Sequence, residues 1–556
     1  MDERQVYTTF AILILALLLL TRLPAMAEYF TIDNVNLAFS LEKFDPRIHQ
    51  PQPPGYPFFV FFARIVNVIF GNAERTFIAV SLVASAAASC VAFALAGRMF
   101  SRWAGAAAAF LLLVNPVFWH ASLDGPLRPQ LALFSLLTAS CCWRCWNGER
   151  RFAYWGAVAL GVGSGFRPDL IAFLSPLWFV STWAGTKSWR IVFGACVLLV
   201  VIVGVWLGTL IIAMGGIRTF AGVMLGYAVE QSGQGSAVFG SSMVAWLRQI
   251  NRLVIWNALA VVGWIWALPF VLGTRTSIEA SPDRARASRH PGAPASIKLS
   301  RHPSSARRGM IVAFFFIWII PGLIVQAMVH VDAPGHTLYS VAALCVLGGY
   351  VLSRLHAREF ALGASLLVNA IFFLDFFPLP AAVNDPNRTP SIKNAILFGS
   401  FEASIGQVRY LDETTRSTLR EIQNFAPKDR PSLIITTDAY VDQWFMNWRI
   451  GRYYLPEQDF WILQNNTKPN RVDRVRRDLV LESRETPLEI PIFREGRILW
   501  LIEPGSAFHK HIAAVQNLMG GKYVFYSDIT PDSPPFTIDG VKSYRSCEPW
   551  ISMTFD

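Results

Sequence analysis

The chain has 556 residues, 53% of them apolar and only 16% charged, with a formal net charge of +11 at pH 7. A single soluble core stops growing well before this length, so the composition excludes an ordinary soluble domain. Many basic residues lie in short loops between apolar runs, which indicates membrane-topology signals rather than nucleic-acid binding.

Apolar runs of membrane-spanning length repeat from residue 6 to residue 377 and predict about eleven transmembrane helices. They lie at 6–27, 76–97, 104–121, 128–146, 152–166, 169–184, 190–214, 252–273, 310–329, 337–353 and 359–377. The segment that follows has ordinary composition and is long enough for one soluble domain. The predicted fold is an α-helical polytopic membrane domain, residues 1–377, with a C-terminal α/β domain, residues 378–556.

The first run has two interpretations. It ends in the A-x-A pattern at Ala25–Ala27, which is typical of a cleaved signal peptide. The preceding "MDER" lacks the net positive charge of a signal peptide. We therefore expect a retained membrane anchor.

A proline-rich segment, "HQPQPPGYPFF" at 49–59, precedes the short apolar stretch 57–70. A stretch of this length is too short to cross a bilayer easily. Proline is well suited to the first turn of a helix. The sequence therefore predicts an interfacial helix over 57–70, on the outer face of the membrane.

The loops alternate in charge. Basic residues mark one side as cytoplasmic, including the stretch 274–308, which we expect to be a disordered linker. The opposite side receives 28–75, 121–127, the turn at 167, 215–251, 330–336 and the C-terminal domain. We expect a multi-pass protein of the inner (plasma) membrane, with its active site and C-terminal domain on the periplasmic or extracytoplasmic side.

The outer loops hold ionisable residues close to helix ends, where charge is costly and often functional. They are Asp33, His49, Asp124, Arg128, Arg167, Asp169, His330, Asp332 and His336. Each has a structural alternative. The two acidic residues Asp33 and Asp124 are candidate helix caps, and the arginines are candidates for snorkelling to lipid headgroups. His49 is a candidate for a hydrogen bond within the proline-rich loop, and Asp169 for a local ion pair with Arg167. The H-x-D-x3-H pattern at 330–336 is a weak metal signal.

An acidic residue after the first helix, followed by "HQPQPPGYP" leading into a short surface helix, resembles the GT-C superfamily of membrane glycosyltransferases. More narrowly, it is similar to the protein O-mannosyltransferase and lipid A aminoarabinose transferase type. The basic hairpin and apolar run of 95–119 also resemble that family. The resemblance covers residues 6–355 and implies a GT-C-like fold.

The resemblance implies transfer of a sugar from a polyprenyl-phosphate carrier to a protein, lipid or glycan acceptor at the outer face, with inversion. The family's catalytic acidic position corresponds to Asp33 and its second acidic position to Asp124. Many relatives carry Asp-Glu where this chain has Asp33-Asn34, so a divalent metal cofactor stays open. The loop 215–251 corresponds to a donor-shaping loop, and we expect it to be mobile.

An inverting displacement needs one carboxylate to take the acceptor proton, and Asp33 is the predicted general base. The phosphate leaving group needs positive charge, which Arg128, Arg167, His330 and His336 would supply. We also predict substrate contacts from His49, Tyr56, Asp169 and Asp332. A lipid-linked donor agrees with the absence of a phosphate-binding glycine loop, and contact with membrane lipids is expected throughout.

The C-terminal segment alternates helical and strand patterns. Helices are predicted over 408–425, 439–451 and 507–520, and strands over 432–437, 497–505 and 522–528. This alternation predicts a small α/β domain outside the membrane, with a role in acceptor recognition or docking.

Two other functions compete with the glycosyltransferase. A transporter or lipid-carrier flippase would line a path through the bilayer with polar groups, whereas here they gather at one face and no repeated halves are evident. A non-catalytic scaffold or sensor would not explain why ionisable residues gather near helix ends on the outer face.

Overall fold

The computed structural model describes residues 3–427 except 241–242, 272–304, 332 and 375–391. After residue 427 it describes 432–437, 446, 448–458, 460–464, 471–475, 481–485, 488–491, 496–501, 509, 513, 517–529, 541–547 and 550–555. The chain divides into two compact units. The helical unit contains Met1–Met26 and Pro53–Gln407, and the α/β unit contains Ala27–Gln52 and Val408–Asp556.

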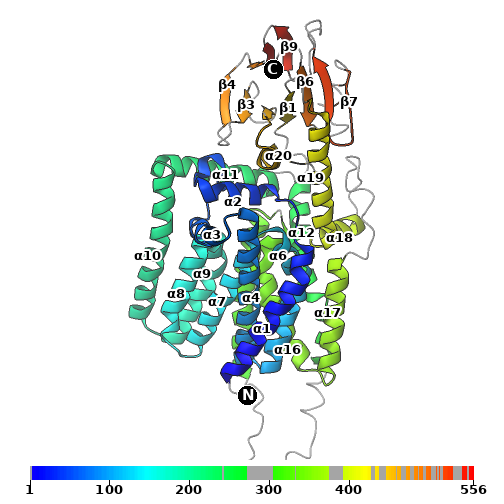
Figure 1. Cartoon of the computed structure of the whole chain (residues 1–556). Coiled ribbons are helices and arrows are strands. Elements are labelled where there is room, and N and C mark those ends of the chain that lie inside the picture. The colour runs from blue at the N-terminus through cyan, green and yellow to red at the C-terminus, as the bar shows by residue number, and fades with distance from the viewer. Residues whose placement is uncertain are drawn as a thin grey trace, which may run out of the picture. The chain divides into compact units, whose positions relative to one another are not determined.

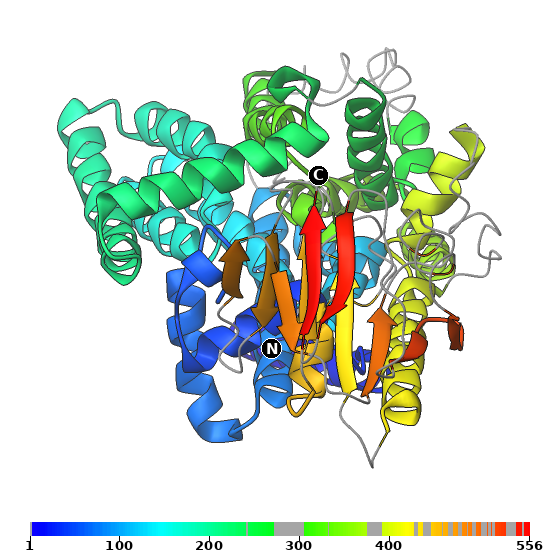
Figure 2. The ribbon, with the colours of Figure 1, turned by 90° about the horizontal axis from the view of Figure 1, so that it is seen from above.

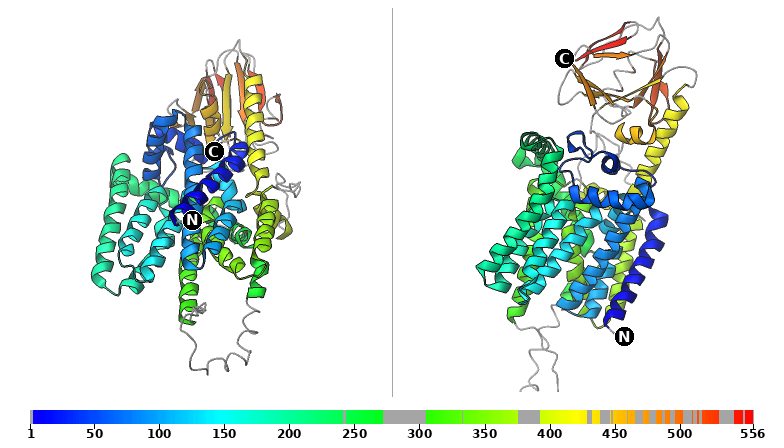
Figure 3. Two further views of the ribbon diagram at one scale, coloured as in Figure 1. Left: turned by 60° about the horizontal axis from the view of Figure 1, so that its bottom comes forward. Right: turned by 60° about the vertical axis from the view of Figure 1, so that its left-hand side comes forward.

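The helical unit consists of long helices packed through small and apolar side chains. Its helices are α1 Glu3–Arg22, α3 Pro57–Phe70, α4 Ala73–Met99, α5 Arg102–Val114, α6 Pro116–Asp124, α7 Arg128–Trp146, α8 Phe152–Phe166, α9 Asp169–Thr186, α10 Trp189–Ala213, α11 Ile217–Gly235, α12 Met243–Val261, α15 Ser305–Met328, α16 Leu338–Ser353, α17 Arg358–Leu374 and α18 Ile392–Phe401. In Figure 1, α7, α8, α9 and α10 lie side by side, and a second view agrees (Figure 3).

Five helices in the described part of the chain are long and apolar enough to cross a membrane, or up to seven if each bent helix pair counts as one span. They are α1, α4, α10, most of α15, and α16 with its preceding turn. The predicted number of eleven is not confirmed. Within the described residues, every predicted apolar run is nevertheless largely helical, and 57–70 forms the separate short helix α3.

The predicted run 104–121 is not one continuous helix, because it forms two helices, α5 and α6, bent by 55°. Pro116 has no backbone N–H to continue the helical bonding, and the residue before a proline avoids helical angles. Asn115 is accordingly extended, and its side-chain oxygen accepts the N–H of Phe118 at 3.1 Å. Its Nδ2 donates to the carbonyl of Leu259 at 3.1 Å, which ties the break to α12.

The prediction that 215–251 is a mobile loop is wrong in its secondary structure. The described part of this segment is largely helical, in α11 and the first half of α12. Apolar residues at helical spacing outweigh the Gly and Ser content that suggested a loop. The predicted run 252–273 also bends by 63°, between Val261 and Ile265. Most of the basic linker 274–308 lies outside the described residues.

The α/β unit combines helices α2 Ile32–Glu42, α19 Ile405–Phe425 (from Val408 on) and α20 Trp448–Tyr454 with two sheets. Its strands are β1 Ser432–Thr437, β2 Phe460–Gln464, β3 Arg471–Val475, β4 Leu481–Glu485, β5 Leu488–Pro491, β6 Gly496–Leu501, β7 Met519–Gly520, β8 Phe525–Ile529, β9 Val541–Cys547 and β10 Trp550–Phe555. The larger sheet has the order β4-β3-β2-β1-β6-β8-β7, and Figure 2 shows its strands side by side.

Strand β1 is central and runs parallel to both neighbours, with Ile434 opposite Phe460 of β2 and Leu499 of β6. The other neighbours in this sheet pair antiparallel. The predicted helix at 408–425 is confirmed, and so is the predicted strand at 432–437. Of the other predicted strands, 497–501 lies in β6 and 525–528 lies in β8, whereas 522–524 forms no strand and 502–505 lies outside the described residues. The predicted helix over 439–451 is formed only from Trp448 onwards among the described residues. Most of 507–520 lies outside them, and its end forms β7 instead.

Candidate active site

The pair Asp124 and Arg128 stands at the junction of α6 and α7. Asp124 ends α6, and Arg128 begins α7 ahead of Pro129. Arg128 Nη1 donates to Asp124 Oδ2 at 2.6 Å, and the side chains are 14% and 8% exposed. The helix dipole disfavours a cation such as Arg128 at the N-terminus of α7, and the Asp124 carboxylate offsets this unfavourable energy. Since the bond uses only Nη1, the guanidinium keeps other N–H groups for a ligand.

Arg167 and Asp169 form a second ion pair at the start of α9. Arg167 Nε and Nη2 donate to the two oxygens of Asp169 at 3.2 and 2.7 Å. The arginine is 5% exposed and is held in a fork geometry that a lysine cannot reproduce. Its guanidinium carbon lies 5.9 Å from the ring centre of Tyr56, the residue that precedes α3.

The segment between α15 and α16 brings two histidines to the same region. His330 follows α15, and His336 lies in the short 3₁₀ helix Pro334–Thr337, with their ring centres 6.4 Å apart. Gln326 Nε2 donates to the carbonyl of His336 at 2.6 Å. His336 lies close enough to Asp169 for their charges to interact. Asp332 lies outside the described residues.

Gly335 joins this segment to the first ion pair. A Cβ atom at Gly335 would lie 2.4 Å from Cδ of Arg128, so the contact requires the absence of a side chain. The structure therefore brings together seven of the predicted residues within the helical unit. They are Tyr56, Asp124, Arg128, Arg167, Asp169, His330 and His336.

Asp33 and His49 belong to the α/β unit. Asp33 is half-buried in the first turn of α2, and the N-cap position is occupied by Thr31 rather than by Asp33. His49 follows the 3₁₀ helix Pro46–Ile48 with a left-handed φ of 59°. Burial and the positive charge of Arg449 lower the pKa of His49 to about 4, so its imidazole is neutral at pH 7.

Two residues, one near the ion pair of Asp124 and one near the first loop, were not predicted from the sequence. His120, in α6, is 2% exposed and lies near enough to Asp124 and Arg128 for electrostatic interaction. The spacing of His120 and Asp124, four residues apart in a helical pattern, is the signal that would have found it. Arg449 of α20 is 6% exposed and bonds to residues of the first loop. No local pattern marks it, because its partners are about four hundred residues away in the chain.

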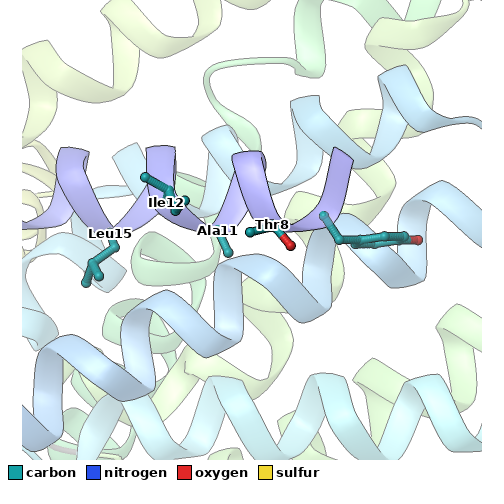
Figure 4. Close-up of a pocket in the computed structure, with 5 residues that line it drawn as sticks. Thr8, Ala11, Ile12 and Leu15 are labelled. Carbon is teal, nitrogen blue, oxygen red and sulfur yellow. The ribbon is translucent and has the colours of Figure 1, made fainter. Parts of the chain in front are cut away.

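Among the described residues, no group of three or more His, Cys, Asp or Glu is arranged to hold a metal ion. An apolar hollow of about 420 Å³ on α1 is lined by Tyr7, Thr8, Ala11, Ile12 and Leu15 (Figure 4). It contains none of the predicted site residues, so it is separate from the candidate active site.

Comparisons with known proteins agree with the fold and with the proline-rich segment. Residues 50–207 match the model of the dolichyl-phosphate-mannose-protein mannosyltransferase family. The crystal structure of ArnT from Cupriavidus metallidurans bound to undecaprenyl phosphate is similar with a TM-score of 0.55 and 14% sequence identity, over 94% of this chain and 98% of that chain.

The apo structure of the same protein is similar with a TM-score of 0.53 and 13% identity, over the same shares of both chains. No curated protein matches the sequence significantly. The family match over 50–207 and the shared fold together confirm the resemblance of this chain to the GT-C superfamily of membrane glycosyltransferases.

Proposed function

We propose that this chain transfers a sugar from a polyprenyl-phosphate donor to an acceptor hydroxyl at the outer face of the inner membrane, with inversion. The observation that carries the proposal is the gathering of Arg128, Arg167, His330 and His336 from three loops of one apolar helical unit. A lipid phosphate is the anion that such a unit would meet at a membrane surface. The similar ArnT structure was solved with undecaprenyl phosphate bound, which supports the same donor class.

The two arginines are suited to hold the phosphate. Each is oriented by a carboxylate, Asp124 or Asp169, and a guanidinium matches the geometry of phosphate oxygens. The carboxylates neutralise much of the arginine charge before the donor binds, so His330 and His336 would add the remaining hydrogen-bond donors. We therefore propose that Asp124 acts on the reaction by orienting Arg128 and not by taking a proton itself.

Asp33 is the proposed general base. The acceptor oxygen forms a bond to the anomeric carbon, its proton passes to the Asp33 carboxylate, and the bond from that carbon to the phosphate oxygen breaks. The polyprenyl phosphate leaves with the bonding electrons and is stabilised by the arginines. His49, neutral at pH 7, would contribute hydrogen bonds rather than charge. A divalent metal ion stays an additional proposal, tested by chelation with EDTA.

The test uses the purified full chain in liposomes. Binding of undecaprenyl phosphate is measured for the wild type, Arg128→Met and Arg167→Met, and we expect each variant to bind at least about tenfold more weakly. Arg358→Met is the matched control, because Arg358 is exposed, forms an ion pair with its neighbour Glu359 and lies 5.2 Å from the ring centre of Trp103, neither of which is a predicted site residue. Equal binding by all four proteins would contradict the proposed phosphate site.

A flippase would give a different result in the same liposomes. It would move an undecaprenyl-phosphate sugar across the bilayer with the sugar–phosphate bond intact. The proposed enzyme instead releases undecaprenyl phosphate and leaves the sugar on an acceptor, which mass spectrometry of the lipid and glycan fractions distinguishes.

A further inference from the structure

The first loop is built into the α/β unit. Residues Ala27–Gln52, which include Asp33, form one compact unit with Val408–Asp556. Val35 of α2 is fully buried in the same apolar core as Leu419 and Ile422 of α19. Phe39 packs edge-on against Tyr453 of α20, with ring centres 5.4 Å apart. The helix that carries Asp33 is therefore a structural part of this unit.

The backbone immediately before α2 is held by side chains of α19 and α20. Asp412 Oδ1 accepts the N–H groups of Glu28 and Tyr29 at 2.9 and 3.0 Å. The N–H of Phe30 donates to the hydroxyl of Tyr454 at 2.9 Å. Asp412 is 2% exposed, and removing the acceptor of a buried N–H leaves that group unsatisfied. Three consecutive amides thus depend on the C-terminal segment.

Arg449 fixes α2 and the end of the loop together. Its Nη1 donates to Oδ1 of Asn36 and to the carbonyl of Ile48, both at 3.3 Å. Its guanidinium also lies 4.5 Å from the ring centre of Trp448. Asn36 lies one helical turn after Asp33. Arg449 therefore restrains α2 within three residues of Asp33, the proposed base.

We propose that Asp412, Arg449 and Tyr454 are positioning residues, through which the C-terminal domain sets the place of Asp33. The inference rests on the proposed role of Asp33 as the base. A base has to be held within a fraction of an ångström of its working position, and a displacement of about 1 Å costs on the order of a hundredfold in rate. The C-terminal domain is then required for the chemical step itself, in addition to any recognition of the acceptor.

The test combines hydrogen exchange with transfer by the full chain in liposomes, with undecaprenyl-phosphate mannose as the first donor probe. In Asp412→Ala and Arg449→Met we expect faster amide exchange in residues 28–36. We also expect transfer to fall at least about tenfold, in kcat and not in the donor KM. Asp412→Asn should behave as the wild type, because its Oδ1 still accepts both N–H groups.

Asp528→Asn is the matched control. It breaks the ion pair of Asp528 with Arg497, which joins β8 to β6 inside the larger sheet. We expect it to leave both the exchange of 28–36 and transfer unchanged. Equal losses in Asp528→Asn and Asp412→Ala would show a general loss of domain stability and would overturn the inference.

The remaining outcomes separate the inference from the proposed function. If Asp33→Asn abolishes transfer but Asp412→Ala and Arg449→Met retain it, the positioning role is wrong and the proposed function stands. Loss of transfer with unchanged exchange in 28–36 also overturns the positioning role. If the wild type transfers no sugar from any polyprenyl phosphate, the proposed function is wrong. The positioning role then also fails, because it rests on Asp33 as the catalytic base.

Discussion

Arg128 Nη1 lies 2.6 Å from Asp124 Oδ2, so one ion pair joins the last residue of α6 to the first residue of α7. Gly125, Pro126 and Leu127 complete the connection, and the arginine side chain also covers Gly335. The ion pair therefore orients the Arg128 guanidinium, which we propose binds the donor phosphate.

Asp124→Asn is predicted to lower transfer by about tenfold, mainly by raising the donor KM. The amide still accepts a hydrogen bond but no longer supplies the charge that orients the guanidinium and offsets the helix dipole. Steady-state kinetics with a polyprenyl-phosphate sugar give the measurement. A large fall in kcat at unchanged KM would instead favour a proton-transfer role for Asp124.

Arg167→Lys is predicted to weaken binding of undecaprenyl phosphate by about tenfold, since a lysine cannot make both bonds to Asp169 and still face a ligand with a planar fork. Arg358→Lys is the matched variant, because it makes the same exchange at an exposed arginine that pairs with Glu359 and is not a predicted site residue. We expect it to bind as the wild type. Equal binding by the Lys variant and the wild type would contradict the prediction.

The sequence predicted the helices well, because apolar runs and helical periodicity are local signals. Alternating loop charge also predicted that the ionisable residues of five outer loops gather on one face. Seven predicted site residues lie together in the helical unit, whereas Asp33 and His49 belong to the α/β unit. The bend after Asn115 was missed because composition stays apolar across it, although the Asn-Pro pair marks it.

What could not be predicted depends on contacts between distant segments. Nothing near Asp412 or Arg449 in the sequence indicates that they bond to residues 28–48, since each partner is a backbone group or a neutral amide. The helical structure of 215–251 was hidden by Gly and Ser, which lower helix propensity without preventing a helix that packs.

The stability of the protein should depend on the protonation of His49. The pKa of this imidazole is lowered from 6.5 to about 4 by burial and by Arg449, so the unfolded chain binds the proton more readily. His49 therefore does not reduce the free energy of unfolding above pH 6.5, where it is neutral in both states. The free energy of unfolding falls as the pH drops from 6.5 towards 4, because the unfolded chain takes up the proton first. Between pH 7 and pH 5 the loss is on the order of 1–2 kcal/mol.

The measurement compares unfolding of the wild type and His49→Asn at pH 7 and pH 5. Asn is chosen because it tolerates the left-handed backbone at this position. The variant should lose less stability than the wild type on acidification. An identical pH dependence would contradict the assigned pKa.

Glu421 of α19 is predicted to stabilise the α/β unit. Its two oxygens accept the N–H groups of Lys522, Tyr523 and Val524 at 2.9, 2.8 and 2.7 Å. Glu421→Ala should lower the free energy of unfolding by about 2–3 kcal/mol, because hydrogen bonds to a charged acceptor are lost together. Pulse proteolysis of the full chain gives the measurement, and Glu421→Gln, which keeps an acceptor, should lose about half as much. Equal stability of the Ala variant and the wild type would contradict the stabilising role of Glu421.

The most direct test of the central claim is transfer by the reconstituted wild type and Asp33→Asn. A panel of undecaprenyl-phosphate sugars is supplied, and released undecaprenyl phosphate is measured by mass spectrometry. We expect the wild type to release it from at least one donor, whereas the Asn variant, folded and inserted normally, releases none above background because an amide cannot take the acceptor proton. Near-normal release by the Asn variant would contradict the assignment of Asp33, and no release by the wild type from any donor would contradict the proposed function.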